Sequence, residues 1–436
     1  MAHDGDAVGS RRTTVAAADE TEATSLAPGD STRPRRVLLV ENTVRGLGGS
    51  YESLFVTASS LDKTRFEPIP LFFQPNHFAE KLEALGIRVL LAKSAHFWEK
   101  KRYIEKSTQV RARLPRGGVL GALRRRVVAF LRAIVGGIPM AWSVYKILRR
   151  ERIDLLHSNN NLQRDSMVIL AGLVAGVPVV AHERQLTRCS LLTRILSSRV
   201  RALVCISGTV LEFAKTSGAR TADRRCIYNA VDVKGLRAVQ PSLPPGPARI
   251  GIVGRILPKK GQRFFIEAAA RVKEKIPKAE FYVIGEATEE FRNYEEELRA
   301  LVDSLSLGSC FHWTGYLDEP LALMASLDVI VHAAVEPEPF GRVIIEALAL
   351  ARPIVATALG GPVEIIEDRI SGFLVPPGDA SAIAEKVLAL LEDSELGSRM
   401  KAAALRRAED FGIDSYIPQI EAVYVDALRL SKGRPT

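Results

Sequence analysis

The chain has 436 residues, 47% hydrophobic content and a formal net charge of +10, which is enough length for two domains with ordinary buried cores. Its four cysteines are widely spaced and form no CxxC pair, so the sequence favours neither a disulfide framework nor a zinc site and indicates a reducing, cytoplasmic compartment. Residues 1–34 are polar and lack the apolar run of a signal peptide, and we expect a disordered tail there.

From residue 35 onward, short apolar runs alternate with longer amphipathic stretches, which is the pattern of a parallel sheet with helices on both faces. The first series spans residues 35–235 and predicts one doubly wound α/β domain. Its predicted strands are residues 37–40, 68–73, 87–91, 154–157, 177–181 and 202–206.

The positive charge is concentrated between Trp98 and Arg152. This segment has 15 Lys and Arg against 3 Glu, a net charge of +12, which leaves −2 for the rest of the chain. Such local basicity argues against a general nucleic-acid binder and favours one surface that meets an anionic partner. Residues 127–145 are apolar, are interrupted by charge and proline, and follow Arg124, Arg125 and Arg126. We expect a helix lying in a membrane interface, with a core helix and a solvated basic flank as the alternative.

Four prolines and no periodicity indicate a linker at residues 236–248. A second alternating series covers residues 249–410 and predicts a second doubly wound domain. Its predicted strands are residues 249–254, 279–285, 310–315, 328–333 and 352–357. Residues 411–436 have apolar positions at near-helical spacing, and we expect a C-terminal helix that crosses back to the first domain. Ligands in such sheets bind at the carboxyl ends of strands, here in a cleft between the domains.

Two cations follow the first strand of the second domain. Arg255 comes directly after Gly254, and Lys260 precedes a predicted helix. Cations at this position can hold a diphosphate and stabilise the charge that it gains as it leaves. A solvated basic loop is the alternative.

Two glutamates flank the start of a predicted helix within residues 336–357. Glu338 lies in the turn PEPFG, and Glu346 lies in the first turns of the helix. The backbone N–H groups of residues 340–342 can bind phosphate or sugar oxygens, and a carboxylate can accept two hydroxyl hydrogen bonds from a ribose. The helix is otherwise apolar, so a buried Glu346 would need a partner.

Glycines and polar clusters follow strands of the first domain. Gly46, Gly48 and Gly49 let the backbone approach a ligand, although their spacing is not a GxGxxG fingerprint and a glycine turn without a ligand is the alternative. HSNNN at 157–161 and HERQ at 182–185 both end predicted strands. His182 could bond a donor sugar and Glu183 or Arg184 could orient an acceptor, whereas a structural histidine is the alternative for His182.

Five motifs occur in order: VGRILPKKG, WTGY, EPFGRVIIEAL, GGPVEII and GFLVPPGD. Together they resemble the family-4 class of retaining glycosyltransferases with the GT-B fold, over about residues 36–430. The resemblance implies two Rossmann-like domains that face each other across a cleft, with the acceptor on the first domain and a nucleotide sugar on the second. YNAVD at 228–232 is similar to the family's asparagine segment, with Ala230 where a glycine is common.

The family roles can be carried onto matching residues. The resemblance implies catalytic roles for Glu338 and His182. It implies donor-diphosphate contacts by Arg255, Lys260, Gly48 and Gly49, donor-sugar contacts by Glu338, Phe340, Gly341 and Arg342, and a ribose contact by Glu346.

The implied chemistry is substitution at the anomeric carbon with retained configuration. The diphosphate takes the acceptor's proton, no enzymic nucleophile is expected, and the two glutamates are not a hydrolase acid and base pair. No cofactor or metal is expected, since no DxD-like cluster is positioned to bind one. The acceptor is expected to be a glycan or lipid-linked molecule of cell-surface polysaccharide or glycolipid synthesis, and no nucleic-acid partner is expected. The protein itself is expected in the cytoplasm or peripherally bound to the inner face of the plasma membrane. A nucleotide-sugar epimerase of the same fold and a non-catalytic membrane-associated scaffold are the alternatives.

Overall fold

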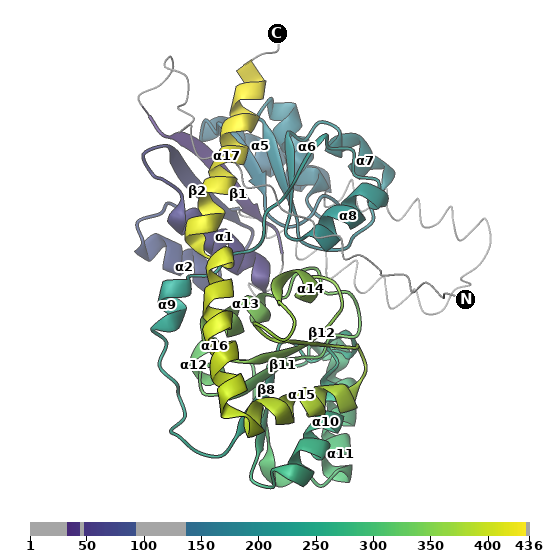
Figure 1. Ribbon diagram of the computed structural model, residues 1–436. Helices are drawn as coiled ribbons and strands as arrows, with labels where there is room; N and C mark the ends of the chain where they lie inside the picture. The colour runs from purple at the N-terminus through teal and green to yellow at the C-terminus, as the bar shows by residue number, and fades with distance from the viewer. Residues whose placement is uncertain (1–32, 44–47, 93–136, 433–436) are drawn as a thin grey trace, which may run out of the picture. The chain divides into compact units, whose positions relative to one another are not determined.

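A computed structural model describes residues 33–43, 48–92 and 137–432. These residues form two parallel sheets with helices between successive strands (Figure 1), so the predicted α/β class with two doubly wound units is confirmed. Several predictions fall outside the described residues. They concern the tail up to residue 32, Gly46, and the basic segment up to residue 136 with Arg124, Arg125 and Arg126.

The first sheet has seven strands in the order β3-β2-β1-β4-β5-β6-β7. The strands are β1 (Arg35–Glu41), β2 (Phe66–Phe72), β3 (Leu90–Leu91), β4 (Leu155–Ser158), β5 (Val179–Glu183), β6 (Ala202–Cys205) and β7 (Asp223–Cys226). The helices are α1 (Gly49–Ser60), α2 (His77–Ala84), α5 (Ile138–Arg150), α6 (Ser166–Ala175), α7 (Leu191–Ser197), α8 (Gly208–Ser217) and α9 (Val233–Arg237). The strand order reverses between β1 and β4, and ligands of such sheets bind where the order reverses.

The second sheet has six strands in the order β10-β9-β8-β11-β12-β13. The strands are β8 (Arg249–Val253), β9 (Glu280–Ile284), β10 (Phe311–Gly315), β11 (Val329–His332), β12 (Ile354–Thr357) and β13 (Phe373–Val375). The helices are α10 (Gln262–Lys275), α11 (Arg292–Ser304), α12 (Leu321–Met324), α13 (Arg342–Ala349), α14 (Pro362–Ile365), α15 (Ala380–Glu392) and α16 (Ser394–Ala408). Its order reverses between β8 and β11, the two strands that precede Lys260 and Glu338.

The central strands are apolar runs because both faces of each sheet are covered by helices. Residues 37–41 of β1 and all of β5 are buried. Two strands were not predicted. β7 has the sequence DRRC at the sheet edge and is only half-buried, and β13 has three residues. β3 pairs over two residues, whereas a strand was expected over 87–91.

The C-terminal segment forms α17 (Ile413–Lys432), the long yellow helix in Figure 1, which contacts α1, β4 and β5 of the first sheet. Its buried residues include Ile420, Val423 and Tyr424, and they share one apolar cluster with β1 and α1. Tyr424 also meets Phe66 of β2 edge to face at 5.5 Å between ring centroids. The helix thereby covers one face of the first sheet.

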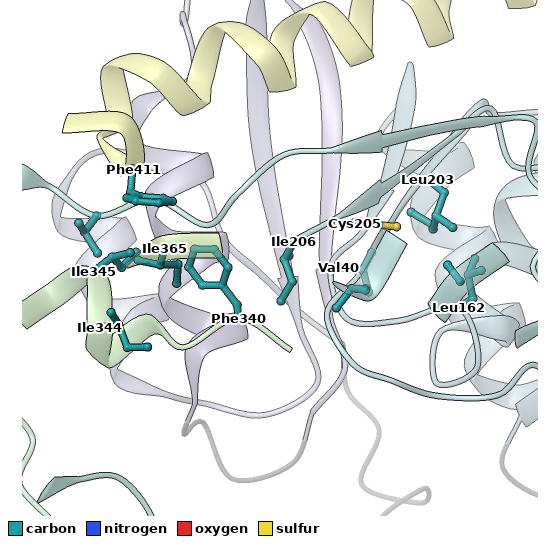
Figure 2. Close-up of a cluster of buried hydrophobic side chains, with 14 of the residues drawn as sticks. Val40, Leu162, Leu203, Cys205, Ile206, Phe340, Ile344, Ile345, Ile365 and Phe411 are labelled. Carbon is teal, nitrogen blue, oxygen red and sulfur yellow. The ribbon is translucent and has the colours of Figure 1, made fainter. Parts of the chain in front are cut away.

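A second apolar cluster contains the residue that precedes Gly341. Phe340 is 2% exposed and packs with Ile365 and Phe411 in this cluster, which Figure 2 shows. The Phe340 ring lies 5.9 Å from Tyr228 and 6.1 Å from Phe411, measured between centroids. Phe340 therefore acts as the anchor of the loop between β11 and α13.

Candidate functional site

An ion pair joins two loops at the carboxyl end of the second sheet. Lys260 ends the short 3-10 helix Pro258–Lys260, after β8, and Glu338 lies in the loop between β11 and α13. Lys260 Nζ donates to Glu338 Oε2 at 2.6 Å. The side chain of Lys260 is 24% exposed and that of Glu338 is 20% exposed. The structure thus brings together two residues that the sequence analysis placed in separate motifs.

His332 stands behind this ion pair and was missed in the sequence analysis. It is the last residue of β11, is 5% exposed, and has Nε2 3.8 Å from Glu338 Oε2. Its position at the carboxyl end of a buried strand, in DVIVHA, is the signal that could have identified it. No hydrogen bond to either of its ring nitrogens occurs among the described residues.

The charges of this cluster follow from burial and from Lys260. Burial, and then the charge of Lys260, lower the pKa of His332 to about 4, so this imidazole is neutral at pH 7. Burial raises the pKa of Glu338, but the surrounding groups, of which Lys260 contributes most, together outweigh burial and lower the pKa of this carboxyl. At neutral pH the cluster is therefore a carboxylate between an ammonium group and a neutral imidazole.

Three glycines shape the loop that carries Glu338. Gly341 has a φ of 106° and directly precedes α13. The N–H of Gly361 donates to the carbonyl of Glu338 at 2.8 Å, and Gly360 lies beside Glu338 in a parallel bridge. A Cβ at Gly361 would lie 2.2 Å from the carbonyl oxygen of Phe340. The GGP motif is needed here because a larger residue would displace the loop.

A second ion pair lies on α13. Arg342 contacts Glu346 Oε1 at 3.2 Å, with side chains that are 15% and 17% exposed. Burial raises the pKa of Glu346, Arg342 opposes that rise, and Glu52 of α1 adds to it. Arg342 also packs against Gly49 at the start of α1, since a Cβ at Gly49 would lie 2.6 Å from its Cδ. Glu346 therefore has the partner that its burial requires, and Gly49 and Arg342 lie side by side.

Arg255 and Gly48 are placed differently. The backbone carbonyl of Arg255 accepts from Gln262 Nε2 at 2.9 Å, but its guanidinium is exposed and makes no ion pair or hydrogen bond to any described residue. The structure does not bring Arg255 into direct contact with the Lys260–Glu338 pair. Gly48 has a φ of 128°, and a Cβ there would meet no described atom within 4 Å, so this position leaves open space.

His182 lies fully buried near the end of β5 and belongs to a chain of three polar rings. Its Nδ1 is 2.7 Å from Nε2 of His157, and Nδ1 of His157 is 2.5 Å from the hydroxyl of Tyr424. Burial lowers the pKa of His157 to about 3 and holds that of His182 well below its usual value. Both imidazoles are therefore neutral at pH 7. Nε2 of His182 makes no hydrogen bond with the described part of the chain.

Arg184 is engaged by the chain's own polar groups. It donates to the carbonyl and the Oδ1 of Asn159 at 2.6 and 2.9 Å and to Oδ1 of Asn229 at 2.5 Å. Asn159 in turn donates to Glu41 at the end of β1 at 2.9 Å. This buried network, which includes the asparagine of YNAVD, ties the strand ends together. The guanidinium of Arg184 is thus held by groups of the protein itself, and Glu183 is 4% exposed with a pKa raised to about 8 by burial.

Two kinds of feature are absent from the part of the chain that the structure describes. No group of three or more His, Cys, Asp or Glu in them is arranged to hold a metal ion. No helix among them combines the length and the apolar character that crossing a bilayer requires.

Known families and relatives match both halves of the chain. Residues 76–234 match the family model described as Glycosyltransferase Family 4, and residues 237–407 match the one described as Glycosyl transferases group 1. Over 174 residues the chain is 31% identical to the alpha-D-kanosaminyltransferase of Streptomyces kanamyceticus, covering 39% of this chain and 44% of that protein. Over 205 residues it is 31% identical to the phosphatidyl-myo-inositol mannosyltransferase of Mycobacterium leprae, covering 45% and 52%. The matched regions thus span about half the length of these curated relatives.

Solved structures show the same fold. The Anabaena protein HepE, in complex with UDP and glucose, superposes with a TM-score of 0.71 at 22% identity over 89% of this chain and 99% of that one. A glycosyltransferase from Rickettsia africae superposes with a TM-score of 0.71 at 18% identity over 91% and 99%. The expected GT-B fold is confirmed, and the two family matches together cover most of the chain. The N-terminal half of the chain thus matches the glycosyltransferases of family 4, and the C-terminal half matches those of the group 1 type.

Proposed function

We propose that this protein is a retaining glycosyltransferase that moves a hexosyl residue from a nucleotide-diphosphate sugar to a glycan or lipid-linked acceptor. The ion pair between Lys260 and Glu338 carries the proposal, because it places an ammonium group and a carboxylate side by side at the reversal point of the second sheet. The ammonium group can bind a diphosphate, and the carboxylate can accept hydrogen bonds from sugar hydroxyls. HepE, a protein of the same fold, was solved with UDP and with UDP-glucose, which supports a nucleotide-sugar donor.

In the proposed reaction the bond between the anomeric carbon and the diphosphate oxygen breaks. The acceptor oxygen bonds to the same face of that carbon, and the acceptor's proton goes to the departing diphosphate. Lys260 and Arg255 stabilise the negative charge that develops on the diphosphate. Glu338 and the N–H groups of residues 340–342 hold the transferred sugar, and Glu346 accepts hydrogen bonds from the ribose hydroxyls.

His182, Gly48 and Gly49 form the opposite wall of the proposed donor site. Gly48 and Gly49 allow the backbone to approach the diphosphate, and Gly49 already lies against Arg342. His182 has one ring nitrogen without a partner among the described residues, and a buried polar atom of this kind costs about 1–3 kcal/mol unless it is bonded. A hydroxyl of the donor sugar would supply that bond.

A donor screen tests this proposal. UDP-, GDP- and ADP-sugars are added to the purified protein, and a cognate donor should raise the melting temperature because it binds only the folded state. With a labelled donor, sugar should then appear on an acceptor and should continue to do so in excess EDTA, since Lys260 and Arg255 supply the positive charge. Isomerised donor without transfer would instead indicate an epimerase. Binding of no donor would favour the non-catalytic scaffold.

We also propose that α5 faces an anionic membrane, where a lipid-linked acceptor would be found. Ile138 and Trp142 are 55% and 58% exposed, Trp142 stacks on Tyr145, and the exposed Arg149 follows on the same helical face. An exposed apolar stripe that ends in basic residues is typical of helices lying in a membrane interface. α7, joined to α5 through α6, exposes further apolar residues, namely Leu191, Leu192 and Ile195.

A further inference from the structure

The chain of rings that begins at Tyr424 ends at the unpartnered nitrogen of His182. Tyr424, His157 and His182 are all fully buried, at 0% exposure. Tyr424 comes from the C-terminal helix, whereas His157 and His182 come from neighbouring strands β4 and β5. The two imidazole rings stack with 4.9 Å between centroids, which fixes their orientation.

When both histidines are neutral, only two arrangements of protons satisfy the Tyr424–His157 and His157–His182 hydrogen bonds. In the first, Tyr424 donates to His157, His157 donates to Nδ1 of His182, and His182 carries its proton on Nε2. In the second, every donation is reversed, and Nε2 of His182 is a bare acceptor.

The unpaired groups distinguish these arrangements. The hydroxyl of Tyr424 has no hydrogen-bond partner other than His157 among the described residues. In the second arrangement its proton would be buried without an acceptor, and Nε2 of His182 would lack a donor as well. The first arrangement leaves one group unpaired, the Nε2–H of His182. Since each buried unpaired donor or acceptor is destabilising, the first arrangement is favoured.

We propose that Tyr424 is a positioning residue that acts through His157 to hold His182 as an Nε2–H hydrogen-bond donor toward an oxygen of the bound sugar. This inference rests on the proposed function for its sugar ligand, but the proton arrangement itself does not. The proposal gives α17 a role beyond covering the first sheet, because this helix supplies the hydroxyl that orders the protons of the three hydrogen-bonded rings. In many functional sites, a group that bonds one ring nitrogen of a histidine fixes which nitrogen carries the proton.

The tautomer can be measured without any donor. In ¹⁵N-histidine-labelled protein, long-range ¹H–¹⁵N correlation spectra distinguish Nδ1–H from Nε2–H imidazoles, and loss of one of seven ring systems in His182→Gln assigns His182. We expect His182 to be the Nε2–H form in the wild type and to become a mixture in Tyr424→Phe. An Nδ1–H form in the wild type, or an unchanged tautomer in Tyr424→Phe, would overturn the proposal.

Three further variants separate proton ordering from packing. Tyr416→Phe removes a buried hydroxyl from the same helix, one that bonds Thr57 at 2.9 Å instead of a histidine, and it should leave the His182 tautomer unchanged. His157→Gln should preserve the Nε2–H form, because the amide oxygen can accept from Tyr424 while the amide nitrogen donates to His182. His157→Leu should lose it. If His157→Gln and His157→Leu behaved alike, the direction of donation would be wrong.

Transfer kinetics then connect the tautomer to the reaction. We expect Tyr424→Phe to lower kcat/KM about tenfold, and the same change made in His182→Gln to cost less than twofold, because the hydroxyl acts only through His182. An equal loss in both backgrounds would show that Tyr424 acts independently of His182. If no donor is turned over at all, the proposed function fails, while the spectra still decide the proton arrangement.

Discussion

Nζ of Lys260 lies 2.6 Å from Oε2 of Glu338, so a single ion pair ties the loop after β8 to the loop before α13. In the proposed donor site, Lys260 supplies the cation for a diphosphate and Glu338 supplies the acceptor for sugar hydroxyls. His332, behind the pair, is neutral at pH 7 and adds no competing charge. The loop positions are further fixed by the contact of Gly361 with Glu338 and Phe340.

Replacing Lys260 by alanine should lower turnover at least about tenfold, equivalent to about 1.4 kcal/mol of transition-state stabilisation. The variant loses the cation for the diphosphate and leaves Glu338 without its partner. Nucleotide release from the cognate donor measures the effect. Lys259→Ala is the matched control, because Lys259 is the exposed neighbour on the same 3-10 helix, and it should change turnover less than about twofold. Equal losses in the two variants would contradict the assignment.

Glu346→Ala should also reduce turnover at least about tenfold, and its loss should depend on the ribose of the donor. The wild type should bind the cognate nucleoside diphosphate more tightly than its 2′-deoxy or 3′-deoxy form, because the carboxylate accepts bonds from the ribose hydroxyls. In Glu346→Ala this preference should disappear. Isothermal titration measures both affinities. A variant that kept the full preference would place the ribose elsewhere.

Gly361→Ala should disturb the loop that carries Glu338. The new methyl group would lie 2.2 Å from the Phe340 carbonyl oxygen and 2.4 Å from its Cα, so backbone must move. Overpacking of this kind costs about 1–3 kcal/mol of the free energy of unfolding, and the displaced Glu338 should lower kcat/KM as well. Gly397→Ala is the control, since Gly397 lies within α16 and its added Cβ would be 3.4 Å from the nearest atom. It should be neutral or slightly stabilising, and similar effects of the two changes would refute the steric argument.

We expect the buried carboxyl of Asp165 to make the folded state less stable as the pH rises. Burial raises its pKa from 3.8 to about 7, although Ser158 and the N–H of Asn160 donate to it. Because the raised pKa belongs to the folded state, the unfolded chain releases the proton first, and stability falls as pH rises from about 4 to about 7. Above pH 7 both states are ionised and this contribution stays constant.

Asp165→Asn removes that ionisation and keeps an oxygen for the two donors. Its free energy of unfolding relative to the wild type should rise between pH 4 and pH 7, by on the order of 1–3 kcal/mol, and then level off. Urea titrations at several pH values measure it. The exposed Asp303→Asn should show no such trend. A difference that shrank as the pH rose would show that the pKa of Asp165 is not raised.

Sequence reasoning identified most strands because a parallel sheet covered on both faces requires apolar runs, and such runs are visible in the sequence. It missed β7 because an edge strand of sequence DRRC is only half-buried and has no apolar signature. The roles implied for Lys260 and Glu338 came from a resemblance, but their contact spans 78 positions and is not legible in either motif. The bond between His157 and Tyr424 spans 267 positions, and packing of α17 alone creates it.

We expect α5, with the basic residues that precede it, to bind an anionic membrane surface. Vesicles that contain anionic lipid should retain the protein, and neutralising Arg124, Arg125 and Arg126 should weaken retention, more so at low salt, since each basic residue near an anionic surface contributes about 1 kcal/mol. Trp142→Ala should weaken it independently of salt, because that ring is 58% exposed on α5 and would bury apolar area in the interface. Co-sedimentation measures retention.

Neutralising Arg271, Lys275 and Lys278, which are exposed on and after α10, is the matched control and should have little effect. Equal retention by neutral vesicles would contradict the electrostatic part of the proposal. Loss of retention in the control variant would show that total charge, and not this surface, attracts the membrane.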